Sequence, residues 1–452
     1  MNATKKRAVN GSVAMLAMAA MLGCSTGTAT EKSGDPSRQE KEQPGKAVSA
    51  AVSTEPVTLT IFNSSMGDEL MKSAIVDPIQ AKYPFMTINV VKKEKGSYME
   101  DLIAAGSVPD IIMGDSSGDI PVYNDLNVLY DMTPLIKKLG FNLSSIDPAV
   151  MDEVRAYTGN ARILAIPRGH NTAVIYYNKD IFDKFGVPYP KDGMTWDEAI
   201  DLSKKVTRLD GGVQYRGLDF AEHILIPYNQ LSLPAIDAKT MKAAVNNDKW
   251  SRLFATLKRV YEADGAKPAP ADYGGRASTI FLKDKTLAMF ASTLMFGALP
   301  DAIKNGLNWD VVTLPSFQEA TGRTIQMFSP FLGISPTSKY KDQAFMAIAH
   351  ILSEDVQVSE AKLGRPSVLS TDRVKTEYGT ANELLKGKNK DAIIKNKFAV
   401  ARPSITKYDP AAYNILRSKF KEVVLNDKDI NTALMEAEEA INKDLEQKQA
   451  AK

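Results

Sequence analysis

An α/β fold is predicted for this chain, because short apolar strands alternate with amphipathic helices along much of its length. Val57–Asn63 alternates apolar and polar residues, which is the pattern of a half-buried strand. Residues 110–113 are almost wholly apolar, as expected of a strand in a parallel sheet that is covered on both faces. With 452 residues, the chain is long enough for two or three domains.

The other elements follow in order. A helix over 65–82 should end at Tyr83-Pro84, because proline restricts the residue before it. A short helix is expected at 97–105, ended by Gly106. Helices dominate the later part of the chain. Further strands are predicted at 86–91, 162–167, 173–177 and 311–315, and further helices at 195–209, 248–263, 340–353, 409–425 and 429–447.

The start of the helix over 195–209 carries a local signal. Thr195 is a good N-cap residue, and Glu198 follows three positions later, which completes a capping box. Trp196 lies between them and is interpreted as a packing residue. This helix start is therefore explained by structure and not by ligand contact.

The composition excludes several classes of function. The chain has 56 Lys and Arg against 54 Asp and Glu, so nothing in its charge predicts a nucleic-acid partner. One Cys cannot form an internal disulfide, and with three His it is a poor basis for a zinc site. Nucleotide-binding glycine loops and H-E-x-x-H are absent from the sequence. We expect no cofactor, no metal and no catalytic residues, hence no enzyme.

The N-terminus is predicted to be a processing signal. Three basic residues at 5–7 precede an acid-free apolar stretch over 8–22. That stretch is too short to span a bilayer but suits a signal peptide. It ends in Gly23-Cys24, which resembles the lipidation site of bacterial lipoproteins. We expect residues 1–23 to be removed and Cys24 to carry the lipid.

The segment from Cys24 to residue 56 is predicted to be a disordered tether. It is rich in Ser, Thr, Gly, Glu, Lys and Pro and has almost no large apolar side chain. The predicted localisation is therefore the extracellular face of the cell membrane, through a lipid anchor.

A set of short segments occurs in a particular order over residues 57–447. They are 108–113 (VPDIIM), 164–167 (LAIP), 175–180 (IYYNKD), 283–290 (KDKTLAMF), 310–317 (DVVTLPSF), 333–335 (GIS) and 363–366 (LGRP). Their order and spacing resemble the family 1 extracellular solute-binding proteins of ABC importers, the family that includes maltose-binding protein.

This resemblance implies a two-lobed periplasmic-binding-protein-like fold with the ligand in the cleft between the lobes. Lobe 1 would comprise residues 57–168 plus 333–364, and lobe 2 residues 169–332 plus 365–452. Ligand-linked closure would deliver a solute to the permease subunits of an ABC transporter. We expect a monomer.

The resemblance also implies ligand-binding residues. Asp115 and Asn171 would accept hydrogen bonds from hydroxyl groups, and Phe296, Tyr408 and Tyr228 would stack on a sugar. For the polar residues a turn or cap role is an equal alternative, as core packing is for Phe296. Arg168 and His170 are added because they could give the cleft positive charge. The full set is Asn63, Asp68, Asp115, Ser116, Arg168, His170, Asn171, Tyr228, Phe296 and Tyr408.

The expected ligand is a mono- or oligosaccharide, and three alternatives stay open. Arg168, His170, Arg276 and Arg402 would suit an acidic saccharide if they made the cleft positive. The three Trp lie in segments that look structural, which leaves room for a noncarbohydrate solute. A surface enzyme or sensory accessory protein on the same scaffold is the third alternative, since paired carboxylates leave no detectable spacing.

Overall fold

The computed structural model describes residues 52–64, 66–115, 118–158, 162–402 and 405–450. All of them belong to one compact unit, Pro44–Lys452. The predicted signal segment, Cys24 and the first part of the predicted tether, to residue 51, lie outside the described residues, as does Ser116. Among the helices that the structure describes, none combines the length and the apolar character needed to cross a membrane.

The first five-stranded sheet has the order β2-β1-β3-β13-β4. β1 pairs in parallel with β2 and β3, whereas β13 pairs antiparallel with β3 and β4. The strand predicted at 162–167 is reduced to its last two residues, β4. The bounds are β1 Val57–Asn63, β2 Met86–Lys92, β3 Ile111–Asp115, β4 Ile166–Pro167 and β13 Pro330–Ile334.

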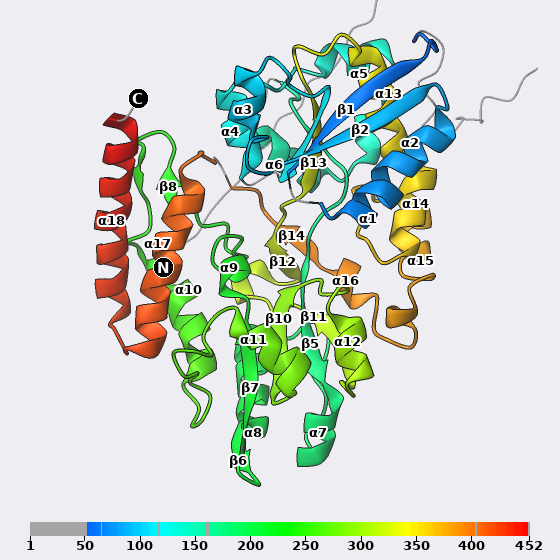
Figure 1. Cartoon of the computed structure of the whole chain (residues 1–452). Helices are drawn as coiled ribbons and strands as arrows, with labels where there is room; N and C mark the ends of the chain where they lie inside the picture. The colour runs from blue at the N-terminus through cyan, green and yellow to red at the C-terminus, as the bar shows by residue number, and fades with distance from the viewer. Residues whose placement is uncertain (1–51, 65, 116–117, 159–161, 403–404, 451–452) are drawn as a thin grey trace, which may run out of the picture. The chain divides into compact units, whose positions relative to one another are not determined.

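Both faces of this sheet are covered. Along β1, Leu59 and Ile61 belong to one buried cluster and Phe62 to another, because successive side chains point to opposite faces. The predicted first helix is present as α1, a π-helical turn over Lys72–Val76 and α2. The helices around the sheet are α1 Asp68–Met71, α2 Asp77–Lys82, α3 Met99–Ala104, α4 Asp119–Asp125, α5 Thr133–Lys138, α6 Pro148–Thr158, α13 Lys341–Ile351 and α14 Glu354–Lys362 (Figure 1).

The second five-stranded sheet has the order β11-β5-β10-β7-β6. β5, between β11 and β10, is buried throughout and pairs antiparallel with both of them. β10 pairs in parallel with β7. The bounds are β5 Ala173–Asn178, β6 Arg208–Asp210, β7 Val213–Phe220, β10 Leu287–Thr293 and β11 Trp309–Thr313.

The capping box at Thr195 is confirmed. Its hydroxyl accepts a hydrogen bond from the Glu198 backbone N–H at 3.2 Å, and the Glu198 carboxylate accepts one from the Thr195 backbone N–H at 2.8 Å. The helix that follows, α8 Trp196–Val206, is shorter than predicted, because β6 occupies residues 208–210 at the edge of the sheet. Trp196 is buried, as the packing interpretation requires.

The remaining elements complete the chain. Two small sheets pair β12 with β14 and β8 with β9. They are β8 Ile236–Asp237, β9 Lys242–Ala243, β12 Arg323–Gln326 and β14 Lys397–Ala399. The other helices are α7 Lys179–Phe185, α9 Glu222–Leu225, α10 Asp248–Lys258, α11 Arg276–Thr279, α12 Leu299–Lys304, α15 Asp372–Glu377, α16 Ala392–Lys395, α17 Asp409–Leu425 and α18 Ile430–Ala450.

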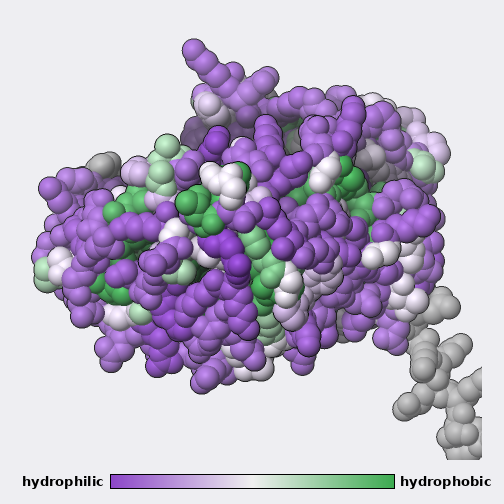
Figure 2. Space-filling view, turned by 90° about the horizontal axis from the view of Figure 1, so that it is seen from below, coloured by the Kyte–Doolittle hydropathy of each residue, from purple (hydrophilic) through white to green (hydrophobic). Residues whose placement is uncertain are grey.

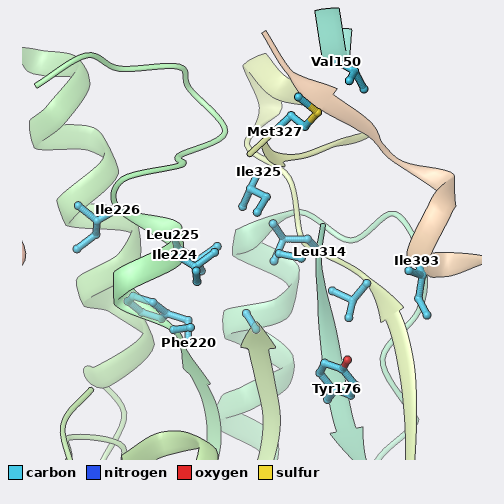
Figure 3. Close-up of a cluster of buried hydrophobic side chains, with 14 of the residues drawn as sticks. Val150, Tyr176, Phe220, Ile224, Leu225, Ile226, Leu314, Ile325, Met327 and Ile393 are labelled. Carbon is cyan, nitrogen blue, oxygen red and sulfur yellow. The ribbon is translucent and has the colours of Figure 1, made fainter. Parts of the chain in front are cut away.

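The core of the second sheet is built from aromatic and aliphatic side chains. Tyr176 of β5, Phe220 of β7 and Leu314 after β11 are all buried in one cluster (Figure 3). Ile325 and Met327 extend that cluster toward β13. Burial of these side chains holds the strands that carry the site residues in place.

Three segments that connect the two sheets run side by side. Hydrogen bonds join them: the Arg168 N–H donates to Pro330 O at 3.0 Å, and the Asn171 N–H to Phe328 O at 3.1 Å. The His170 N–H reaches Pro366 O at 3.4 Å, which adds the third segment. The connections between the sheets are therefore tied together by backbone bonds that do not depend on side-chain identity.

Candidate ligand-binding site

A cavity of about 370 Å³ is lined by residues from both sheets and from the connecting segments. The first sheet contributes the end of β3, the second contributes the loop after β10, and α14 forms part of the wall. We call it the cleft cavity. It brings together half of the predicted site residues, namely Asp115, Arg168, His170, Asn171 and Phe296.

Asp115 reaches the cleft cavity because β3 ends there. Its backbone N–H donates to the Asp119 carboxylate at 3.0 Å, which turns the chain from β3 toward α4. Gly114 precedes it, and a Cβ at this position would lie 2.7 Å from Asp119 Oδ2 and 2.9 Å from the Phe331 ring. Only glycine fits this close approach, so the small residue before Asp115 has a structural reason.

Arg168 is a buried cationic residue in the wall of the cleft cavity. Its residue surface is 8% exposed, and its Nη2 donates to Glu360 Oε2 at 3.2 Å. Burial lowers the pKa of the Arg168 guanidinium, although Glu360 opposes that shift. Its Nε is buried and has no hydrogen-bond partner among the residues that the structure describes. A donor is thus left unused in the wall of the cavity.

The second oxygen of Glu360 is also in use. Arg365 Nη1 donates to Glu360 Oε1 at 2.7 Å. Arg168 and Arg365 belong to two different connecting segments, so a single carboxylate of α14 joins them. Sequence reasoning missed Glu360, since nothing in an exposed-looking helical pattern marks it as the partner of an arginine 192 positions away.

Gln357, one turn earlier in α14, fixes the same segments by neutral hydrogen bonds. Its Nε2 donates to Arg168 O at 3.1 Å, and its Oε1 accepts from the Ser367 hydroxyl at 2.6 Å. The residue is buried and lines the cleft cavity. It too was absent from the predicted site. α14 therefore positions the backbone on which the predicted residues Arg168 and His170 stand.

His170 is neutral near physiological pH. Burial lowers the pKa of its imidazole from 6.5 to about 4. Its ring packs edge-on against Phe398, with 4.7 Å between ring centroids. His170 and Phe398 also line a second cavity, of about 540 Å³. His170 therefore brings a polar but uncharged ring to the cleft cavity.

Charges in the cleft cavity balance. Among the described residues that line it, Arg168 and Arg365 are cationic, and Asp115 and Glu360 are anionic. The remaining lining residues are neutral, and they include the half-buried ring of Phe296. The cavity thus combines an apolar face with polar groups and carries no net charge.

Two predicted residues of the first loop do not line the cleft cavity. The Asn63 side chain accepts from the Met66 N–H and donates to Met66 O, both at 2.8 Å, so its amide holds the loop after β1. Asp68 is exposed and forms an ion pair with Lys92 at 2.6 Å. The turn alternative therefore explains Asn63, while Met66, which it holds, does line the cavity.

The two predicted tyrosines also lie outside the cleft cavity. Tyr228 stacks on Phe328 with 4.1 Å between ring centroids, and it lines a neighbouring cavity of about 210 Å³. Tyr408 precedes the first residue of α17, and the Lys407 ammonium lies 5.5 Å from its ring centroid. Neither is assembled with Phe296 into one stacking platform.

The arginines that would make the cleft positive are paired with acids. Arg276 lies 3.4 Å from both Asp272 and Asp284. Arg402 is buried, donates to the Tyr413 hydroxyl at 2.7 Å and lies 3.6 Å from Asp409. Within the described part of the chain, no cluster of His, Cys, Asp and Glu could hold a metal ion.

Much of the surface is hydrophilic, and apolar residues are exposed in separate patches between polar ones (Figure 2). The apolar patches are small, and this view shows no single large apolar face.

Comparison with known proteins relates residues 74–375 to the family described as bacterial extracellular solute-binding protein. Among curated proteins, the chain is 26% identical over 246 residues to the sn-glycerol-3-phosphate-binding periplasmic protein UgpB of Agrobacterium fabrum, covering 50% of this chain and 53% of that one. It is 27% identical over 309 residues to the arabinooligosaccharide-binding protein of Bacillus subtilis, covering 64% and 65%. The chain spans about half to two thirds of the length of these relatives.

Solved structures confirm the predicted fold. An ABC substrate-binding protein from Listeria monocytogenes in complex with cycloalternan aligns with a TM-score of 0.69 at 21% identity, covering 86% of this chain and 98% of that one. The sugar-binding protein MalE from Xanthomonas citri aligns with a TM-score of 0.70 at 16% identity, covering 87% and 99%. At these identities the match shows a shared α/β, two-lobed periplasmic-binding-protein-like architecture.

Proposed function

The chain belongs to the family of bacterial extracellular solute-binding proteins, and we propose that it captures a carbohydrate in the cleft cavity and delivers it to an ABC transporter. The observation that carries this proposal is the make-up of the cavity. It has no net charge, an aromatic face at Phe296, and polar groups at Asp115 and Asn171. Sugars offer hydroxyl groups and apolar C–H faces, which is the matching chemistry.

The names of related proteins support this ligand class. The relative in Bacillus subtilis is described as arabinooligosaccharide-binding, and the aligned structure from Listeria monocytogenes holds cycloalternan. A cavity of about 370 Å³ lies within the usual range for small-ligand sites, roughly 300–1,000 Å³. We propose that the ligand is a short neutral saccharide, with Asp115 and Asn171 accepting hydrogen bonds from its hydroxyl groups.

A phosphorylated polyol is the second candidate ligand. It is favoured by one specific observation, the similarity to proteins described as sn-glycerol-3-phosphate-binding. The charge balance of the cleft cavity argues for the neutral saccharide, because Glu360 already occupies both Arg168 and Arg365. An anion would have to compete with that carboxylate.

We propose the predicted division of the body into lobes, with residues 57–168 plus 333–364 in lobe 1 and 169–332 plus 365–452 in lobe 2. The strands of the first sheet support it except that β13 begins at Pro330, a little before residue 333. The strands of the second sheet fall within 169–332. A ligand that contacts both lobes would stabilise the closed arrangement by its differential affinity.

Calorimetric titration of the full body with maltotriose, arabinotriose, D-glucuronate and sn-glycerol 3-phosphate tests the ligand class. We expect heat and a smaller radius of gyration in X-ray scattering with a neutral saccharide. Binding of sn-glycerol 3-phosphate alone would replace the first candidate by the second. Product analysis after long incubation with the saccharides tests for turnover, and we expect none.

We also propose that Cys24 anchors the protein to the outer face of the cell membrane and that the receptor is a monomer. The residues that support the anchor are Gly23-Cys24 after the basic and apolar N-terminal stretch. Labelled palmitate should be incorporated into the wild type and not into Cys24→Ser. Release of the wild type into the medium, at the same level as the variant, would contradict the anchor.

A further inference from the structure

Glu360 stands out because it uses both carboxylate oxygens on arginines in the wall of the cleft cavity. The Arg168 and Arg365 guanidinium groups lie at 3.2 and 2.7 Å from its two oxygens. Glu360 itself is 9% exposed, so water screens these contacts only weakly. A buried carboxylate in this position requires compensation, and the two arginines supply it.

Arg168 and Arg365 differ in their burial and in their hydrogen bonds. Arg168 is held in place with its Nε buried and without a partner among the described residues. Arg365 is about one-third exposed on its side chain and lies at the rim. A ligand in the cavity therefore meets an arginine whose positive charge is already paired with Glu360.

We infer that Glu360 sets the charge selectivity of the receptor, making the cleft cavity accept a neutral ligand in place of an anion. This inference rests on the proposed function for the identity of the neutral ligand. With Glu360, the described lining carries two cationic and two anionic side chains. Without the Glu360 charge, the lining has two cationic side chains and only Asp115 to balance them. The net charge of the cavity is then positive, which makes it an anion site.

The variant Glu360→Gln tests the inference, because the amide keeps the size of the side chain and removes the charge. We expect the affinity for D-glucuronate and sn-glycerol 3-phosphate, relative to maltotriose or arabinotriose, to rise by about tenfold or more, equivalent to about 1.4 kcal/mol. An affinity ratio within about twofold of the wild type would overturn the inference.

A second variant changes the charge in the other direction. Arg365→Gln leaves Arg168 and Glu360 paired, and its position at the rim makes the fold tolerant of the change. The relative affinity for anions should fall below that of the wild type. In the double variant Glu360→Gln/Arg365→Gln, the original charge balance returns, so the affinity ratio should move back toward the wild-type value. An equal ratio in both single variants would overturn the inference.

Glu354→Gln is the matched control, since Glu354 lies on the same helix and pairs with Arg373 at 3.7 Å, away from the cleft cavity. Its affinity ratio should equal that of the wild type. If the wild type binds no saccharide, the proposed function fails by itself. Even then, a gain of anion binding in Glu360→Gln supports the role of Glu360, and the absence of a gain overturns it.

Discussion

Two buried arginines, Arg168 and Arg402, have opposite electrostatic surroundings. Their residue surfaces are 8% and 5% exposed. Burial lowers the pKa of Arg168 more than its carboxylate partner raises it. For Arg402, burial also acts to lower the pKa, but Tyr413, Tyr157 and nearby carboxylates outweigh it, so its pKa is raised. Equal burial therefore does not mean equal charge compensation.

The difference separates a structural residue from one that is available to a ligand. Arg402 hydrogen-bonds to Tyr413 of α17 and lies beside Asp409 at the start of the same helix. Arg168 lines the cleft cavity and uses one nitrogen on Glu360, and its buried Nε has no partner among the described residues. We expect changes at Arg402 to act on stability and changes at Arg168 to act on affinity.

The largest effect is expected for Arg402→Met. This change leaves Asp409 buried without its cation, and breaking such a pair typically costs about 3–5 kcal/mol in the free energy of unfolding. Urea denaturation measures it. Arg252→Met is the control, because Arg252 forms an exposed ion pair with Glu319 and should lose about 1 kcal/mol or less. Equal losses in the two variants would remove the distinction between Arg402 and a surface arginine.

A second prediction concerns His170, two positions after Arg168. Its pKa falls from 6.5 in the unfolded chain to about 4 in the native protein, so between these values the unfolded state binds the extra proton. The stabilisation is complete above about pH 6.5 and is lost as the pH falls toward 4, by an amount on the order of 3 kcal/mol.

Unfolding free energies of the wild type and His170→Asn, measured from pH 7.5 to 4.5, check this prediction. The variant should lose part of the pH dependence, because the other titrating groups are common to both proteins. Parallel curves for the two proteins would show that His170 is protonated as easily in the native state as in the unfolded one.

Arg168→Gln should weaken saccharide binding about threefold to tenfold, the range for one lost hydrogen bond. Its stability should change less than that of Arg402→Met, since Glu360 keeps Arg365 as a partner. Arg168→Lys retains the charge but not the planar set of N–H donors, so we expect it to bind almost as weakly. Wild-type affinity in Arg168→Gln, by calorimetry, would exclude Arg168 from the ligand site.

The smallest effect is expected for Thr195→Ala, which removes the capping box of α8. Loss of such a cap costs about 1 kcal/mol in unfolding free energy. Saccharide affinity should stay unchanged, because Thr195 does not line the cleft cavity. A change in affinity would mean that α8 is coupled to the site. The contacts of Arg168 and Arg402 give no reason to expect such a coupling.

Contacts between residues close in the sequence could be predicted, and contacts between distant residues could not. The Thr195–Glu198 box was predictable because both partners lie within three positions. The resemblance places Asp115 and Asn171 at a site, Arg168 is expected there for its charge, and the structure brings all three to one cavity. Their use as ligand contacts stays a prediction. In the acidic-saccharide alternative Arg402 adds positive charge to the cleft, but in the structure it is paired with Asp409 and hydrogen-bonded to Tyr413.

The sequence by itself determined the alternation of strands and helices, the capping box and the family, because each depends on neighbouring residues or on ordered segments. The lipid anchor at Cys24 stays a prediction. The tertiary structure decided which charges meet. Glu360 and Gln357 lie 192 and 189 positions from Arg168, and only folding brings α14 against the connecting segments. The charge of the cleft cavity depends on that contact, since an arginine acts as an anion site or as a neutral donor according to the carboxylate beside it.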